Sequence, residues 1–307
     1  MKIVLLDALT FGETNLKGFE KLGEVVIYQT TLTEQTLKRI IDADVIVTNK
    51  VVITKEHMSK CKNLKLICIA ATGMNNVDLE AAEAKDIKVK NVIAYSTESV
   101  IQHTFSMFFY LMGHSRYYDD VVKSGTYSKS PIFTDVSQPF YEVFGKKWGI
   151  IGLGSIGQGV AKIADAFGAD VNYYSTSGKN TSQAYHRLKL DTLLKECDII
   201  TIHAPLNKDT NNLLDYKELS KLKEGAIVLN LGRGGIINED AIAKIIDEKK
   251  LYFGLDVLTQ EPMKENHPLL SITNKQNLYI TPHIAWTSVE ARQKLIASVI
   301  KNIKSLK

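Results

Sequence analysis

Gly152-Leu153-Gly154-Ser155-Ile156-Gly157 is the stretch of sequence that decides the fold. It follows the apolar run 148–151, which predicts a strand, and it opens the amphipathic segment 155–168, which predicts a helix. Glycines here let the backbone turn tightly and approach a pyrophosphate, whose negative charge the N–H groups of the helix bind. With a further strand predicted at 170–174, this order indicates a dinucleotide-binding site, although a tight turn without ligand is the alternative.

Short β-branched runs recur along the chain, separated by helix-length amphipathic stretches, which is typical of βαβ units with a parallel sheet. One series lies within residues 1–98 and a second within residues 148–282. The sequence therefore predicts an α/β fold with two Rossmann-like or flavodoxin-like open parallel sheets. We expect a discontinuous domain of residues 1–98 and 284–307 and a nucleotide-binding domain of residues 99–283, joined by one long helix over 99–122.

Composition excludes several classes of function. The formal charge of +4 is spread without long runs of one sign, which argues against a nucleic-acid or lipid surface and suits small anionic molecules. No apolar run approaches the ~20 residues of a membrane span, and the N-terminal run is too short for a signal peptide, so we expect a cytoplasmic protein. The three cysteines form no CxxC pair, and no His/Asp/Glu group has metal-ligand spacing, so we expect no metal.

Ser175 stands where the strand after the glycine motif ends. An NAD-specific site presents an acidic residue at this position, which binds the ribose hydroxyls and repels a 2′-phosphate. Here the serine is followed by the hydroxyl residues Thr176 and Ser177 and then by Gly178 and Lys179. The lysine is able to pair with an extra phosphate. The cofactor is therefore NAD or NADP, since Ser175 is equally able to hydrogen-bond NAD.

Three more polar segments follow later strands: Asn230–Gly234, Leu255–Pro262 and Thr281–Trp286. Together with the glycine motif and AATGMNNVD (70–78), they resemble the D-isomer-specific 2-hydroxyacid dehydrogenase family over essentially the whole chain. The segments TNKVV (48–52), YSTESVIQHTF (95–105) and PHIAW (282–286) are most similar to its glycerate dehydrogenase (hydroxypyruvate reductase) branch.

The resemblance predicts a catalytic triad. His283 would donate a proton to the substrate oxygen in reduction and remove it in oxidation, because imidazole titrates near neutral pH. Glu261 would hydrogen-bond that imidazole and orient it, and the planar cation of Arg233 would bind the 2-oxo acid. Each residue alone has an ordinary structural explanation, but their joint order favours the triad. Formate dehydrogenases carry Gln where Glu261 stands, so the carboxylate favours 2-hydroxy acid chemistry.

The resemblance also implies binding residues. Backbone N–H groups around Thr72 and Gly73 would hold the substrate carboxylate with Arg233 and His283. Lys50 would lie beside them, unless it is a solvated loop charge. The expected cofactor contacts beyond the glycine motif are Ser175, Lys179, Ala204, Pro205, Thr210, Leu231, Gly232 and Asp256, of which Asp256 would lie near the nicotinamide. The segment 204–210 has an ordinary βα loop as its alternative.

We therefore expect an NAD(P)-dependent D-2-hydroxyacid dehydrogenase whose active site lies between a substrate domain and a nucleotide domain that close on each other. Hydroxypyruvate is the first choice of substrate, although glyoxylate, pyruvate and bulkier 2-oxo acids are compatible with the same residues. Aromatic residues after position 125 suggest an arm that forms a homodimer. The rival functions are another oxidation on the same fold, such as that of phosphite or 3-phosphoglycerate, and a non-catalytic NAD(H)-sensing protein.

Overall fold

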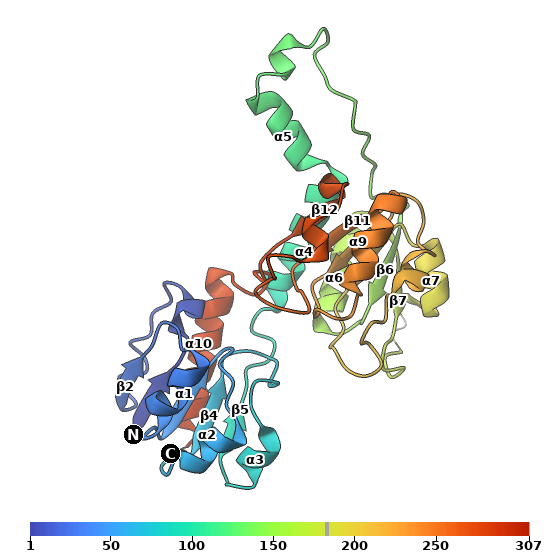
Figure 1. The fold of residues 1–307 in the computed structure, drawn as a ribbon. Coiled ribbons are helices and arrows are strands. Elements are labelled where there is room, and N and C mark those ends of the chain that lie inside the picture. The colour runs from blue at the N-terminus through green and yellow to red at the C-terminus, as the bar shows by residue number, and fades with distance from the viewer. Residues whose placement is uncertain (182–183, 307) are drawn as a thin grey trace. The chain divides into compact units, whose positions relative to one another are not determined.

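The computed structural model describes residues 1–181 and 184–306 and divides the chain into two units. The first unit comprises Met1–Ser96 and Trp286–Lys307, and the second comprises Thr97–Ala285. Each unit contains one parallel sheet with helices on both faces (Figure 1). The predicted α/β class with two open parallel sheets is confirmed.

The first unit has a five-stranded sheet in the order β2-β1-β3-β4-β5. Alternate side chains of a strand face opposite sides, so Ile3 and Leu5 join one core and Val4 and Leu6 the other. The C-terminal helix covers the first core, and three short helices cover the second. The elements are β1 (Lys2–Leu5), η1 (Ala8–Phe11), β2 (Glu24–Ile27), α1 (Thr33–Ile40), β3 (Val45–Thr48), α2 (Lys55–Lys60), β4 (Leu66–Ile69), α3 (Leu79–Glu83), β5 (Lys88–Lys90) and α10 (Val289–Lys304).

The second unit has a seven-stranded sheet in the order β12-β11-β10-β9-β6-β7-β8. Helices α4 and α6 pack on one face, and α7, α8 and α9 pack on the other. Burial of both faces explains why the central strands are continuous apolar runs. The strands are β6 (Lys147–Ile151), β7 (Asp170–Tyr174), β8 (His186–Arg187), β9 (Ile199–Ile202), β10 (Ile227–Asn230), β11 (Tyr252–Leu255) and β12 (Leu278–Ile280). The helices are α4 (Thr97–Met112), α6 (Ser155–Ala166), α7 (Leu190–Glu196), α8 (Tyr216–Leu219) and α9 (Glu239–Glu248), with η3 (Pro268–Leu270) and η4 (Lys275–Asn277).

The single helix expected over 99–122 is wrong. Helix α4 ends at Met112, and α5 (Ser115–Lys123) begins after His114, which adopts a left-handed conformation with φ 47°. Helix α4 is buried in the second unit, whereas α5 has no buried residue. Helix α5, η2 (Tyr127–Lys129) and the irregular chain that follows project from this unit as an arm, and the chain rejoins the core at the buried Val143 (Figure 1).

Candidate active site

The carboxyl edge of the seven-stranded sheet carries the polar segments singled out in the sequence. Because all of its strands are parallel, the loops that follow them emerge at one edge. The loops after the neighbouring strands β12, β11 and β10 carry His283, Glu261 and Arg233. The loops after β9, β6 and β7 carry the expected cofactor residues other than Leu231, Gly232 and Asp256, which follow β10 and β11. One end of this edge therefore holds the candidate catalytic residues and the other holds the candidate nucleotide residues.

The glycine motif is packed as a close backbone turn. Gly152 has φ +93°, and a Cβ on it would lie 2.9 Å from the backbone nitrogen of Ala204. A Cβ on Gly157 would lie 2.3 Å from the Gly152 oxygen, so neither position has room for a side chain. A Cβ on Gly154 would meet open space, and no side chain of the described residues caps α6 there. The free helix N-terminus and the open approach at Gly154 fit a dinucleotide pyrophosphate.

The turn after β7 is tied to the glycine motif. The buried Ser175 accepts a hydrogen bond from the Asn180 backbone at 3.3 Å, and the Asn180 side chain donates to the Leu153 oxygen at 2.5 Å. Lys179 is exposed on this turn. Arg187, which the sequence analysis missed, donates from β8 to the Gly178 oxygen at 3.2 Å. The turn where an adenosine ribose is expected thus carries one cation, Lys179, and is contacted by a second, Arg187.

The loop after β9 is closed by Thr210. Its fully buried hydroxyl donates to the Pro205 oxygen at 2.7 Å and accepts from the Asn207 backbone at 2.8 Å. Ala204 lies against two glycines, because a Cβ on Gly232 would lie 2.8 Å from the Ala204 oxygen. The loops after β6, β9 and β10 therefore pack backbone against backbone.

Leu231 shows how the loop after β10 is anchored, since its side chain lies in the core formed by α4 and α6. Gly232, the other expected cofactor residue of this loop, has no side chain and offers a ligand its backbone atoms alone.

His283 and Glu261 form a close pair. His283 Nδ1 lies 2.6 Å from Glu261 Oε2, and both side chains are partly exposed, at 25% and 30%. The other carboxylate oxygen, Oε1, accepts from the Leu258 backbone at 3.0 Å, which fixes the glutamate. A carboxylate only accepts hydrogen bonds, so Nδ1 carries a proton and Nε2 is the atom left to exchange one with a substrate.

Asp256 holds the loop that carries His283. Its carboxylate is 2% exposed and accepts from the Thr281 hydroxyl at 2.6 Å and from the backbone of Ile284 and Ala285 at 2.8 and 2.9 Å. These bonds flank His283, whose backbone is left-handed with φ 56°. The structure thus gives Asp256 a contact with the histidine loop that the sequence analysis did not predict.

His103 on α4 joins the same network. Its Nε2 lies 3.1 Å from the Thr281 hydroxyl and 3.6 Å from Asp256 Oδ1. Thr281 donates its proton to Asp256, so it accepts from His103. Burial lowers the pKa of His103 more than the Asp256 charge raises it, which favours a neutral ring. The sequence offered only a weak signal for this role, a histidine on the helix expected to join the domains.

Arg233 is exposed, and no ion pair forms between it and any other described residue. Asn230 shapes its loop by accepting from Gly232 N at 3.1 Å and donating to the Arg233 oxygen at 2.8 Å. A Cβ on Gly234 would lie 2.0 Å from the Leu258 backbone, so this loop packs directly on the segment that leads to Glu261. The guanidinium donates one hydrogen bond to the Gly232 oxygen at 2.8 Å, and its remaining N–H groups are available to an anion.

Lys50, Thr72 and Gly73 belong to the first unit, on the loops after β3 and β4. Lys50 and Thr72 are exposed, and the Thr72 hydroxyl donates to the Val92 oxygen at 3.1 Å.

Comparison with known proteins decides the family. The family model "D-isomer specific 2-hydroxyacid dehydrogenase, NAD binding domain" matches residues 105–285, which is more than half of the chain. The chain belongs to the D-isomer-specific 2-hydroxyacid dehydrogenase family. It is 37% identical to the hydroxypyruvate reductase of Blautia hydrogenotrophica over 99% of this chain and 96% of that protein. The family and the hydroxypyruvate reductase branch predicted from the motifs are thus confirmed.

Two solved structures resemble this family member along its whole length. An acyclic imino acid reductase in complex with NADPH and D-Arg has a TM-score of 0.86 and 29% identity, covering 100% of this chain and 97% of that one. The D-lactate dehydrogenase of Aquifex aeolicus, complexed with NAD and lactic acid, has a TM-score of 0.85 and 27% identity, covering 100% and 95%. This family member is an NAD(P)-dependent oxidoreductase acting on 2-hydroxy acids.

Other features of this family member bear on the site indirectly. Both ring nitrogens of His203 are buried without a hydrogen-bond partner among the described residues, and burial lowers its pKa to about 3, so it is neutral. The described residues contain no group of three His, Cys, Asp or Glu side chains suited to a metal ion. Within the same residues, every helix is too short or too polar to cross a membrane.

Proposed function

We propose that this chain reduces small 2-oxo acids, hydroxypyruvate first among them, to D-2-hydroxy acids in a reversible reaction. The observation that carries the proposal is the His283–Glu261 pair beside the loop of Arg233, at the same sheet edge as the glycine motif. Hydroxypyruvate is preferred because the related protein of Blautia hydrogenotrophica is a hydroxypyruvate reductase. The nicotinamide, when bound, supplies or accepts the hydride.

The protein's own side chains donate the proton to the substrate and stabilise the negative charge that develops on it. His283 Nε2 gives a proton to the substrate oxygen in reduction, and Glu261 stabilises the imidazolium before that transfer. Arg233 binds the 2-oxo carboxylate and stabilises negative charge that develops on the oxygen. Lys50 and the backbone at Thr72 and Gly73 are the proposed contacts from the first unit. This proposal assigns the nucleotide, Arg233 and His283 to unit 97–285, and the further substrate contacts to unit 1–96 with 286–307.

A spectrophotometric assay tests the proposal directly. NADH and NADPH oxidation is followed with hydroxypyruvate, glyoxylate, pyruvate and phenylpyruvate, and we expect hydroxypyruvate to give the highest kcat/KM. Turnover with none of these acids, while cofactor binding is detected by fluorescence, would contradict the enzyme and favour an NAD(H)-sensing protein.

We also propose that NADPH is accepted as well as NADH. Ser175 offers no negative charge to repel a 2′-phosphate, and Lys179 on the same turn and Arg187 of β8, which contacts that turn, provide two cations for it. We expect Lys179→Ala and Arg187→Ala each to lower kcat/KM for NADPH about tenfold, as the loss of one charge-assisted hydrogen bond predicts, with little change for NADH.

Lys195→Ala is the matched control for the cofactor variants, because it removes an exposed lysine on α7 that pairs with Asp191. It should leave both cofactors unaffected. A wild-type protein with a strong preference for NADH, or variants that lose both cofactors equally, would contradict a 2′-phosphate site on this turn.

The arm supports a homodimer. Phe133 is 89% exposed and Val136 is 76% exposed, and Phe140, Tyr141 and Phe144 are also exposed on the same segment. Exposed apolar surface of this extent is typical of a protein interface. We expect light scattering to give about twice the 34.3 kDa of one chain, and the variant Phe133→Asp with Phe140→Asp to give one chain. A wild-type monomer at micromolar concentration would contradict the dimer.

A further inference from the structure

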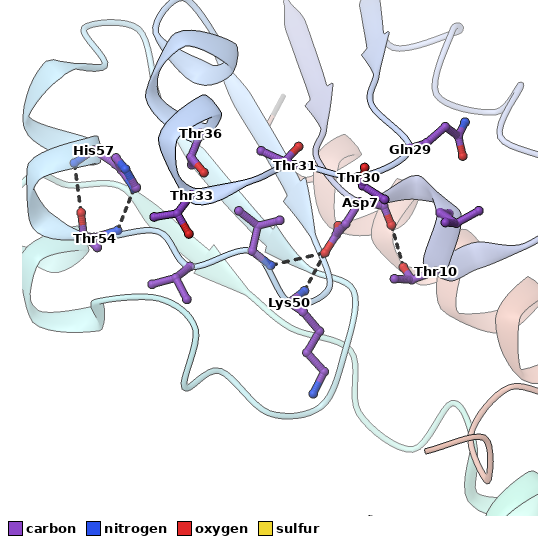
Figure 2. A pocket seen from close by; sticks show the side chains of 13 residues that line it. Asp7, Thr10, Gln29, Thr30, Thr31, Thr33, Thr36, Lys50, Thr54 and His57 are labelled. Atoms are coloured by element: carbon purple, nitrogen blue, oxygen red, sulfur yellow. Dashed lines mark hydrogen bonds between the residues drawn. The ribbon is translucent and has the colours of Figure 1, made fainter. Parts of the chain in front are cut away.

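Asp7 occupies the switch point of the five-stranded sheet. The chain passes from β1 outward to β2 and then returns to β3 on the other side of β1, so the loops after β1 and β3 diverge. Asp7 follows β1 and is only 7% exposed. It is also part of the wall of a cavity of about 460 Å³, a size in the range of ligand pockets (Figure 2).

The Asp7 carboxylate binds the loop after β3 through consecutive backbone groups. Oδ2 accepts from Asn49, Lys50 and Val51 N–H at 3.0, 2.7 and 3.3 Å, and Oδ1 accepts from Asn49 N–H at 2.9 Å. The Thr48 hydroxyl lies 3.2 Å from Oδ2 and donates to it. Burying a carboxylate is costly unless hydrogen bonds satisfy its oxygens, and these donors satisfy them while holding the loop in place.

The same loop is held from its other side by Asn76. The Asn76 side chain donates to the Asn49 oxygen at 3.4 Å and to the Val51 oxygen at 3.2 Å, and it is 8% exposed. Asn76 belongs to the segment that begins with Thr72 and Gly73. Asp7 thus binds the N–H groups of the loop, while Asn76 binds its carbonyl groups.

Asp7 and Asn76 hold the backbone of residues 49–51, and Lys50 is the residue among these three with a charged side chain. Its backbone is bound to Asp7, but its side chain runs away from Asp7 beside the cavity (Figure 2). The Lys50 side chain is exposed, and no ion pair is formed by it within the described residues. A long flexible amine binds an anion well only where its backbone is held in place.

We propose that Asp7 is the positioning residue of the substrate-binding edge of the first unit. It holds the backbone of Asn49–Val51 so that Lys50 meets the carboxylate of the 2-oxo acid, and it touches neither substrate nor cofactor. The inference rests on the proposed function, because it gives Lys50 a substrate to bind. Substitution of Asp7 should therefore lower the affinity for the acid and leave the affinity for the nucleotide unchanged.

Asp7→Asn tests this with little change in shape. The amide places an NH₂ group where a carboxylate oxygen met backbone N–H donors in either orientation of the side chain. We expect KM for hydroxypyruvate to rise about tenfold, with a smaller change in kcat and an unchanged Kd for NADH by fluorescence. Amide hydrogen exchange of residues 48–51 should become faster.

Asp44→Asn is the matched control. Asp44 accepts a backbone hydrogen bond from Lys2 at 2.7 Å in the same unit, but it precedes β3 and lies at the amino edge of the sheet. It should alter neither KM nor exchange at 48–51. Lys50→Ala should raise KM as well, and Asp7→Asn should add little to it, because both changes remove one contact.

The outcomes separate the two proposals. The positioning role of Asp7 would be overturned if Asp7→Asn made exchange at 48–51 faster without changing KM. It would also be overturned if the effects of Asp7→Asn and Lys50→Ala on KM were fully additive. Unchanged exchange would overturn the anchoring of the loop. A wild-type protein that reduces no 2-oxo acid would overturn the proposed function, and the exchange measurement would then still decide whether Asp7 holds the loop.

Discussion

Replacing His283 by alanine should lower kcat for 2-oxo acid reduction by about 10²–10⁴, the range that general acid catalysis contributes. The physical reason is the geometry of the pair, in which Glu261 binds Nδ1 at 2.6 Å and leaves Nε2 to donate the proton. Single-turnover kinetics with NADH and hydroxypyruvate would measure the loss. The Kd of NADH should stay within about threefold of the wild-type value, because the glycine motif is untouched.

His267→Ala is the matched control for this variant. His267 Nε2 pairs with Glu239 Oε2 at 2.9 Å in the same unit, and both side chains are nearly buried, at 10% and 11%. The control removes a second histidine–glutamate pair, more buried than the first, that has no proposed role in the chemistry. If His267→Ala lowered kcat as much as His283→Ala, or if His283→Ala kept more than a tenth of the wild-type rate, the general acid would have to be another residue.

The strands and their shared carboxyl edge could be predicted because they depend on patterns that the sequence displays. Apolar runs that end in polar or glycine residues mark the carboxyl ends of buried parallel strands. That rule placed Arg233, Glu261 and His283 after three strands, which prove to be the neighbours β10, β11 and β12. The 2.6 Å contact between two of these residues follows from the sheet order, which the sequence did not display.

Other features could not be predicted from apolar spacing. The segment 99–122 has helical spacing throughout, and only Gly113 signalled the break at which His114 becomes left-handed. Asp7 and Asp256 accept hydrogen bonds from backbone groups of other loops, and Asn230 bonds to backbone groups further along its own loop. Backbone N–H groups are the same in every sequence, so the partners of such side chains become visible only in three dimensions. Asp7 did carry a signal, since it follows a strand at a carboxyl edge.

Replacing Arg233 by alanine should lower kcat/KM for hydroxypyruvate by about 10³, the effect of removing a preorganised charge from a developing oxyanion. The loop that carries Arg233 is shaped by Asn230 and packs on Leu258, so the backbone should keep its place when the side chain is shortened. The loss should therefore appear in both kcat and KM, because one guanidinium binds the carboxylate and stabilises the reacting oxygen.

Two measurements decide whether the guanidinium itself is responsible. Arg233→Lys keeps the charge but loses the planar fork, and we expect it to recover only part of the lost kcat/KM. Added guanidinium ion should restore some activity to Arg233→Ala and none to His283→Ala. Only the first variant lacks a guanidinium group and has an empty volume that the added cation is able to fill. Equal activity of Arg233→Lys and the wild type would mean that charge alone suffices. Activity of Arg233→Ala within about threefold of the wild type would assign substrate polarisation to another cation, with Lys50 the first to examine.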